Sequence, residues 1–451
     1  MADVTDVNRG NAGANLPTLR GHNAALVLDL LRTAGEGGIS RLELAERTGL
    51  TPQAVSKITA RLRTEGMAAE AGRRASTGGK PRTVLRLVPS AAHAVGLHLD
   101  RDELTAVLVD LAGTPVAVRR VPLDLGTGAE RVIEAAAVQV DAVRADAVRA
   151  VRADAVRAVR ADAVRGEAVG PGAVRDEAVR GEARRVGGGA VGGVRVDSVR
   201  TGAGAGFGGP HGVAGPHGVG GPHGVGELLG VGELLGVGVA MPGPLDHTTG
   251  VPRRVTGFPQ WDGFPLREAL AARLQLPVVL DKDTNAAALG LALRGPGDSF
   301  AYLHLGTGLG AGLVLGGTLH RGARTGAGEF GHQVIQLDGP LCECGNRGCI
   351  EALCLAAVAR GDLAEAARVL GAGAANLVGL LDIDRVLLGG RTIAAHEECF
   401  VRGVAAAVAE RARGAGISVA AAEGGAHPVA EGAAQLVLAP VFRHRRSAEL
   451  G

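Results

Sequence analysis

The most informative stretch of the chain covers residues 329–351 and reads EFGHQVIQLDGPLCECGNRGCIE. Cys342, Cys344 and Cys349 lie within eight positions, and His332 stands ten positions before the first of them. Three thiolates and one imidazole form a complete tetrahedral ligand set for Zn²⁺, and the glycines between the cysteines permit tight turns. The alternative is a set of unrelated buried cysteines with a histidine nearby. The spacing favours a structural zinc site without an open coordination position.

The composition indicates a reduced globular protein of two or three domains. The 451 residues are 46% hydrophobic but only 2% aromatic, so the core must be built from Val, Leu, Ala and Ile. The N-terminus MADVTDVNRG has no secretory-signal pattern, and no uninterrupted apolar run reaches the length of a membrane span. The five cysteines are clustered and odd in number, which argues against a disulfide framework. We expect a cytoplasmic protein with no membrane partner.

Three helical patterns stand near the N-terminus. The first begins at Asn23, a candidate N-cap. The second follows Ser40, with Glu43 in the position of a capping box. The third follows Thr51, with Pro52 at its first helical position. Helix, helix, short turn and helix are the plan of a helix-turn-helix.

The surrounding residues complete a winged helix-turn-helix over residues 19–89. A basic loop at 73–82 and an alternating strand after it predict the wing. Residues 19–90 hold 12 Lys and Arg against 6 Asp and Glu, a local excess of positive charge that suits nucleic acid. Residues 1–18 are polar and unpatterned, so we expect a disordered tail there.

Beyond residue 90 the pattern becomes α/β. The predicted helices are 266–274 and 286–293, and the predicted strands are 94–99, 104–110, 116–122, 236–241, 278–280, 300–305, 311–315 and 385–388. Residues 138–235 interrupt this pattern with short repeats of A-V-R-A-D, G-P-H-G-V and G-V-G-E-L-L. We interpret them as a flexible low-complexity insertion, helical in places. Residues 90–137 and 236–451 then form one α/β domain.

Two further signals are weaker. The glycine-rich run 306–312 lies between two predicted strands, where it could bring backbone amides to phosphate or form a plain hairpin. Asp283 follows a predicted strand, where it could accept a proton from a hydroxyl or begin the next helix.

Together these motifs resemble the ROK family of sugar-responsive repressors, open reading frames and sugar kinases. The resemblance covers residues 20–137 and 236–440, and its cysteine loop is the most specific part. It rests on Gly236–Pro244, Asp283-x-Asn285, Gly306–Gly312, Glu329–His332, the cysteine loop, Glu351 and Leu388–Gly390. It implies a two-lobed actin-like (ribonuclease H-like) domain with a sugar in the cleft between the lobes. A winged helix before that domain is typical of the repressor branch.

The resemblance also implies roles for individual residues. Asp283 matches the catalytic base, and Glu329, His332 and Glu351 match the other sugar contacts. One ring nitrogen of His332 would bind zinc while the other faces the sugar. Gly306, Thr307, Gly308 and Gly310 match a phosphate loop.

The chain departs from the family's pattern at two places, one on the nucleotide side and one at the sugar contact. The kinases carry Asp-x-Gly-Gly-Thr in the first hairpin, where this chain has His98-Leu99-Asp100-Arg101-Asp102. Two carboxylates there would repel ATP. The residue before the base is usually Asn, and here it is Lys282. We therefore expect Asp283 to be a vestigial base, the 306–310 turn to be a vestigial phosphate loop, and the protein not to be an enzyme.

The expected DNA contacts come from the third helix and the wing. They are Thr51, Gln53, Ser56, Lys57, Arg61, Arg73, Arg74 and Lys80. The alternative is a solvated helix face with a charged linker.

The combined prediction is a sugar-responsive transcriptional regulator of ROK type. Its partners would be operator DNA, a sugar or sugar-phosphate effector, structural Zn²⁺ and a second copy of the chain in a homodimer or tetramer. The alternatives are an ATP-dependent sugar kinase and a relic without function.

Overall fold

The computed structural model describes residues 16–76, 79–167, 232–295, 299–411 and 416–442. The side chains of 16–20, 75–76, 79–81 and 151–167 are outside this description. The chain divides into two units, residues 1–152 with 226–451, and residues 153–225. Residues 1–15 of the predicted tail and most of the predicted insertion lie outside the described residues, while residues 16–18 of that tail belong to α1. The fold below is that of the first unit.

The N-terminal part of the first unit is a winged helix-turn-helix. It contains α1 (Leu16–Ala34), α2 (Arg41–Thr48), α3 (Pro52–Thr64), β1 (Ile39–Ser40), β2 (Ala68–Ser76) and β3 (Gly79–Leu87). The Ser40–Glu43 capping box is present, and the Thr51 hydroxyl accepts a hydrogen bond from the Ala54 amide. These caps satisfy amides that a helix start leaves without partners. They explain why both helices begin where the sequence predicts.

Two predictions for this head are wrong. Asn23 is not an N-cap, because α1 already begins at Leu16 and runs through it. The basic segment 73–82 is not a loop, because β2 and β3 pair through Ser76 and Gly79 and leave only residues 77–78 undescribed. Backbone pairing with a neighbouring strand outweighs the weak strand propensity of these Gly, Arg and Ser residues.

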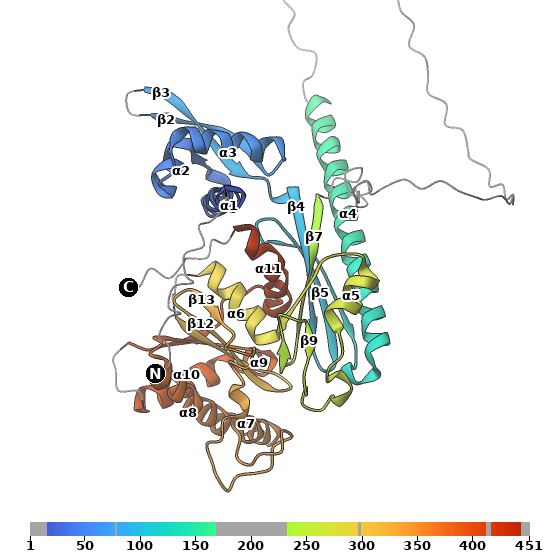
Figure 1. Ribbon diagram of the computed structural model, residues 1–451, viewed down its shortest axis with the longest axis vertical. Helices are drawn as coiled ribbons and strands as arrows, with labels where there is room; N and C mark the ends of the chain where they lie inside the picture. The colour runs from blue at the N-terminus through green and yellow to red at the C-terminus, as the bar shows by residue number, and fades with distance from the viewer. Residues whose placement is uncertain (1–15, 77–78, 168–231, 296–298, 412–415, 443–451) are drawn as a thin grey trace, which may run out of the picture. The chain divides into compact units, whose positions relative to one another are not determined.

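The α/β domain consists of two lobes whose sheets share one topology (Figure 1). The first sheet has the order β10-β7-β4-β5-β6 and the second β13-β12-β11-β14-β15. In each, three strands form an antiparallel meander, a fourth pairs in parallel with its first strand, and a fifth pairs in parallel with the fourth. The first-lobe strands are β4 (Ala92–Leu99), β5 (Glu103–Asp110), β6 (Pro115–Pro122), β7 (Glu233–Met241) and β10 (Val278–Lys282). The second-lobe strands are β11 (Phe300–Leu305), β12 (Leu309–Leu315), β13 (Thr318–His320), β14 (Arg385–Gly389) and β15 (Ser418–Ala421). This repeated order confirms the predicted two-lobed actin-like fold.

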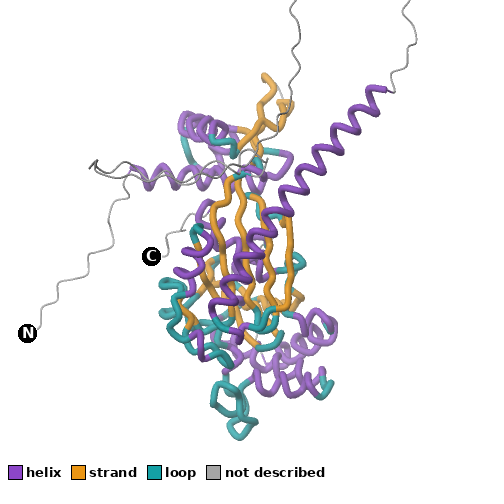
Figure 2. Tube along the Cα trace, turned by 90° about the vertical axis from the view of Figure 1, so that its right-hand side faces the viewer, coloured by secondary structure: helices purple, strands orange, loops and turns teal. Residues whose placement is uncertain are grey.

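Helices cover both sheets. In the first lobe, residues 129–152 of α4 (Ala129–Glu167) and α5 (Leu266–Leu274) share a buried cluster with the strands, and Figure 2 shows this part of α4 running along them. In the second lobe the cover is α7 (Ile350–Ala359), α8 (Leu363–Leu381) and α10 (Glu397–Arg411). Within the described residues, α8 alone is long and apolar enough to span a membrane, but 56% of its apolar window is buried. Such burial is what a core helix shows.

Two helices, α6 (Asp283–Arg294) and α11 (Pro428–Phe442), lie together between the sheets. Gly96 and Gly238 let α11 approach the first sheet, because a Cβ at either would lie 1.8 Å from a carbonyl oxygen of α11. The end of α11 then meets the head. Leu438 and Phe442 share one buried cluster with Val27 and Leu31 of α1, and the Arg32 guanidinium lies 5.1 Å over the Phe442 ring. The winged helix-turn-helix head and the helices between the sheets are therefore in direct contact.

The insertion begins later in the structure than the sequence predicts. The prediction ended the first lobe at residue 137, but Val140, Val143 and Ala147 of α4 are fully buried in the lobe core. The first A-V-R-A-D repeats carry Val and Ala at helical spacing, so they continue the face that covers the sheet. Residues 138–152 therefore belong to the lobe, and the unit boundary falls at 153.

Candidate functional site

A cleft lies between the two lobes, and residues of both lobes line it. Its walls come from turns that follow strands, the usual place for a ligand in an open α/β sheet. The first lobe contributes Asp100, Arg101, Pro242, Gly243, Lys282 and Asp283, and the second contributes Thr307–Gly310, Gly328, Glu329, His332 and Glu351. All four predicted sugar contacts therefore line one cleft.

Asp283 is the first residue of α6, directly after β10. One of its carboxylate oxygens accepts a hydrogen bond from the Thr284 amide at 2.6 Å. Burial raises the pKa of Asp283 to about 7, and that effect exceeds the lowering by the Thr284 amide. The group can therefore exchange a proton near neutral pH, as an acceptor for a ligand hydroxyl requires.

Lys282, flagged by the sequence as a departure, lies inside the cleft with a side chain only 2% exposed. Its ammonium donates to Glu329 Oε1 at 2.9 Å and to the carbonyl oxygen of Ala327. A buried ammonium needs such partners because desolvation would otherwise be costly. Glu329 is thus held by Lys282, which leaves part of its carboxylate for a ligand.

Glu351, at the start of α7, is buried and accepts a hydrogen bond from the Leu309 amide at 2.8 Å. This bond ties α7 to the turn between β11 and β12. The run 306–312 contains the hairpin turn between β11 and β12, with Leu305 paired to Leu309, and its role as a phosphate loop stays a prediction. Gly312 is required for packing, because a Cβ there would lie 2.2 Å from the Thr284 carbonyl oxygen.

His332 and the three cysteines of the loop converge at the edge of the cleft. Their four ligand atoms lie within 4.8 Å of one another and could hold a metal ion. Cys344 Sγ and Cys349 Sγ are 3.7 Å apart, and Cys342 Sγ is 3.7 Å from His332 Nδ1. A tetrahedral Zn²⁺ with Zn–S bonds of about 2.3 Å sets its sulfurs about 3.8 Å apart. The donor set therefore fits zinc, and Nδ1 is the nitrogen that faces the thiols.

Two family models match the chain. The ROK family model covers residues 228–360, and a winged helix-turn-helix DNA-binding model covers residues 27–67. Residues 228–360 thus match the ROK family, and residues 27–67 match a winged helix-turn-helix.

The ROK domain is similar to both kinases and repressors. It is 43% identical over 131 residues to a glucokinase of Thermotoga maritima, a stretch that covers 28% of this chain and 41% of the glucokinase. It is 36% identical over 116 residues to a xylose repressor of Caldicellulosiruptor bescii, which covers 25% of this chain and 29% of the repressor. The chain thus matches less than half the length of these curated relatives.

One solved structure matches head and ROK domain together. It is a ROK family transcriptional regulator, a homolog of the E. coli MLC protein, with a TM-score of 0.62 over 94% of this chain and 98% of that one. Its sequence identity is 17%, so the match concerns the fold. The shared fold supports the order of domains found here.

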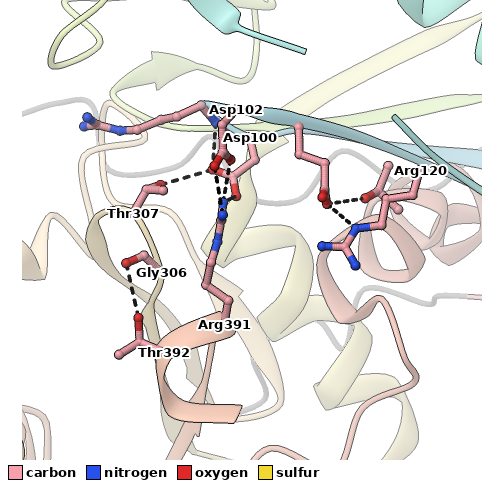
Figure 3. A network of polar contacts seen from close by, with 10 residues as sticks. Asp100, Asp102, Arg120, Gly306, Thr307, Arg391 and Thr392 are labelled. Atoms are coloured by element: carbon pink, nitrogen blue, oxygen red, sulfur yellow. Dashed lines mark hydrogen bonds and ion pairs between the residues drawn. The ribbon is translucent and has the colours of Figure 1, made fainter. Parts of the chain in front are cut away.

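On the far side of the ROK cleft, Asp100 and Asp102 are not unpaired carboxylates. Both bind the guanidinium of Arg391, at 2.6 Å from Nη2 in each case, and Asp102 accepts a second bond from Nη1 at 2.9 Å (Figure 3). The guanidinium lowers the pKa of Asp102, and for Asp100 the nearby His98, the Arg101 amide and Arg391 together outweigh burial and lower its pKa. The 98–102 turn is therefore occupied by a side chain of the other lobe.

The predicted DNA contacts on α3 are exposed. Gln53, Ser56, Lys57 and Arg61 face solvent, although Arg61 also lies 3.5 Å from Glu65. The Thr51 hydroxyl is engaged as the cap of α3.

The predicted wing contacts differ from one another. Arg73 is exposed, whereas Arg74 is paired with the capping-box Glu43 at 3.2 Å and donates to the Gly37 carbonyl oxygen. Arg74 thus ties the wing to α2. The side chain of Lys80 lies outside the described residues.

Sequence reasoning missed Arg391. It follows the Gly389-Gly390 pair, and Gly390 takes a φ of 97° that suits glycine. The sequence did contain a signal, because two carboxylates two positions apart in one turn, Asp100 and Asp102, call for a basic partner. Nothing in the sequence says that this partner stands about 290 positions away.

Proposed function

We propose that this protein is a sugar-responsive transcriptional regulator, which binds a sugar in the ROK cleft and operator DNA through the head. The observation that carries the proposal is the direct contact between the two parts. Helix α6 begins at Asp283 in the cleft and packs on α11, and the end of α11 packs on α1 of the head. A ligand that changes the relation of the lobes would therefore act on the helix that supports the head.

Sugar binding is supported by the acceptors that line the cleft. Asp283, Glu329 and Glu351 offer carboxylate oxygens to hydroxyl groups, and the second ring nitrogen of His332 is left for the ligand when Nδ1 faces the thiols. A neutral sugar or a sugar phosphate is the proposed effector. Xylose repressors are among the similar proteins, which agrees with this chemistry.

Zinc is the proposed metal of the cysteine loop. When bound, it would hold the loop and fix the orientation of the His332 ring toward the cleft. The proposed role is structural, because the four protein ligands complete its tetrahedron.

Operator DNA is the proposed partner of the head, through Thr51, Gln53, Ser56, Lys57, Arg61, Arg73, Arg74 and Lys80. A homodimer or tetramer would present two heads to one operator, as helix-turn-helix regulators do. A protein with this task works in the cytoplasm.

The second candidate is an ATP-dependent sugar kinase. The observations in its favour are the 43% identity to a glucokinase over 131 residues and the raised pKa of Asp283. The contact of Arg391 with Asp100 and Asp102 opposes it, because this ion pair lies where phosphates would need donors rather than carboxylates.

Two assays on the full chain separate the candidates. A thermal-shift screen over neutral sugars and sugar phosphates identifies the effector, because a ligand that binds only the folded state raises its stability. A coupled ADP-release assay with the same sugars then tests for turnover. The regulator predicts a shift without ADP release, and sugar-dependent ADP release would make the chain a kinase.

A further inference from the structure

Three consecutive residues of the first lobe reach across the cleft. They form the turn between β4 and β5, and each touches the second lobe. Asp100 and Asp102 bind Arg391 at the start of α9 (Arg391–Ala395), and Arg101 lies 3.5 Å from Glu343 of the cysteine loop. The turn is thus linked to the second lobe at two separate places.

The contact at Arg391 has the geometry of a strong pair. The guanidinium binds both oxygens of Asp102, a bidentate arrangement, and the same Nη2 binds Asp100 Oδ2. The Thr307 hydroxyl adds a bond of 3.3 Å to the other oxygen of Asp100. Planar bidentate pairs of this kind fix orientation as well as adding energy. Figure 3 shows the Arg391 guanidinium pointing at the two carboxylates, with Gly306 and Thr307 beside them.

The two carboxylates of this contact differ in how far they are exposed to solvent. The Asp100 side chain is 18% exposed, whereas Asp102 is 57% and Arg391 46% exposed. Exposed ion pairs are screened and contribute little, but a shielded carboxylate that loses its cation is left uncompensated. Loss of Arg391 would therefore leave two neighbouring carboxylates without their shared cation.

The position of Arg391 is set by its own lobe. Gly390 precedes it with a positive φ, and the Thr392 hydroxyl that follows donates to the Gly306 carbonyl oxygen at 3.5 Å. Arg391 is therefore held beside the hairpin turn at 306–308, and Asp100 and Thr307 both line the cleft. The ion pair therefore joins the two turns, 98–102 and 306–308, at one edge of the cleft.

We propose that Asp100, Asp102 and Arg391 form an interlobe clasp that holds the ROK cleft closed where a kinase would hold nucleotide phosphates. Arg391 is a positioning residue, since it acts on the ligand site through Asp100 and not by contact with the ligand. The part of the proposal that concerns ligand affinity rests on the proposed sugar binding. The proposed closure of the cleft by the ion pair does not depend on sugar binding.

The test compares Arg391→Ala with Arg120→Ala in the full chain. Arg120 is the matched control, because its ion pair with Glu103 lies next to the clasp but within the first lobe (Figure 3). Hydrogen–deuterium exchange of peptides covering 98–105 and 304–310, without any sugar, reports opening at the two turns. We expect exchange in both peptides to be about tenfold faster in Arg391→Ala, an effect between that of an exposed pair and that of a buried one. Exchange in 304–310 should be unchanged in Arg120→Ala, whose partner Glu103 lies within the 98–105 peptide.

A double-mutant cycle excludes a merely local effect. Asp102→Asn and Arg391→Ala remove the same pair, so their effects on exchange in 304–310 should not add. Arg391→Lys keeps the charge without the bidentate fork, so it should restore part of the protection. Exchange in Arg391→Ala equal to wild type at both turns would overturn the clasp.

Sugar affinity is measured last, with a hit from the thermal-shift screen. We expect Arg391→Ala to bind about tenfold more weakly through faster dissociation, and wild-type affinity to fall as NaCl rises from 0.1 to 1 M as the clasp is screened. A wild-type protein that binds none of the sugars would refute the proposed function. The clasp would then be tested by the hydrogen–deuterium exchange result alone. An unchanged sugar affinity together with slow exchange would refute the clasp alone.

Discussion

Replacement of Asp283 by Asn tests the electrostatics of the cleft. Burial raises the pKa of this carboxyl from 3.8 to about 7 in the folded protein. The folded state therefore favours the protonated form, and the ionised form costs stability. That cost is absent below the unfolded pKa near 4, grows as the pH rises from 4 to 7, and is complete above 7. Asn resembles the protonated carboxyl at every pH, so Asp283→Asn should be more stable than wild type at pH 8.

The size of the effect follows from the shift. About three pKa units, at about 1.4 kcal/mol each, give about 4 kcal/mol for a fully shielded group. Asp283 opens on the cleft, and solvent there reduces the gain to about 2 kcal/mol. The measurement is urea unfolding of both proteins between pH 5 and 8.5. The difference in unfolding free energy should be largest above pH 7 and shrink toward pH 5.

The matched control is Asp246→Asn. Hydrogen bonds from Thr248 and Thr249 lower the pKa of Asp246 to about 2, so the sign is reversed and this variant should lose stability near neutral pH. If Asp283→Asn were no more stable than wild type at pH 8, or if the difference did not vary with pH, the raised pKa would be refuted.

Sugar binding should change in the opposite direction. A hydrogen bond to a charged acceptor contributes about 1.5–3 kcal/mol, so Asp283→Asn should weaken sugar binding about 10- to 100-fold at pH 8. The loss should shrink below pH 7, where the wild-type carboxyl is also protonated. Calorimetric titrations at pH 6 and pH 8 measure both values.

The remaining predictions concern the metal, the repeats and the head. Metal analysis should find about one Zn²⁺ per chain, and Cys344→Ser should lose it and expose the 329–349 segment to protease; a well-folded wild type without zinc would contradict the site. Deletion of 153–225 with a short linker should change stability little, whereas deletion of 138–225 should cost several kcal/mol because it removes the buried Val140 and Val143; equal melting temperatures would contradict the corrected boundary. Lys57→Ala should weaken operator binding and reduce its salt slope by about one, and Arg63→Ala, whose partner is Glu70, is the control; an unchanged slope in Lys57→Ala would exclude a phosphate contact.

The sequence predicts most of the fold because its strands and caps are local signals. The apolar runs at 94–99, 104–110 and 300–305 are strands β4, β5 and β11, and the capping residues Ser40 and Thr51 begin α2 and α3. Local chemistry sets these elements, so one stretch of sequence is enough to find them.

Other features depend on partners distant in sequence. The repeats at 138–152 have the same letters as those that follow, and only the sheet beneath α4 makes their Val and Ala a core face. The wing strands form because β2 and β3 pair with each other.

The candidate site shows the same limit. Its lining residues follow from the family resemblance, but the ion pairs Lys282–Glu329 and Arg391–Asp100 do not. These ion pairs join side chains that come together only when the lobes do. The amino-acid sequence shows which residues are charged but not which of them form ion pairs.

The central claim is that a ligand in the ROK cleft changes the DNA affinity of the head. The direct measurement uses a labelled operator, selected from random DNA by the wild-type chain, and follows its fluorescence anisotropy as the sugar found by thermal shift is added. Our account predicts that the sugar changes operator affinity at least tenfold in the wild type, that Asp283→Asn needs a higher sugar concentration for the same change, and that no ADP is released with ATP present. An operator affinity that stays constant at saturating sugar would contradict it.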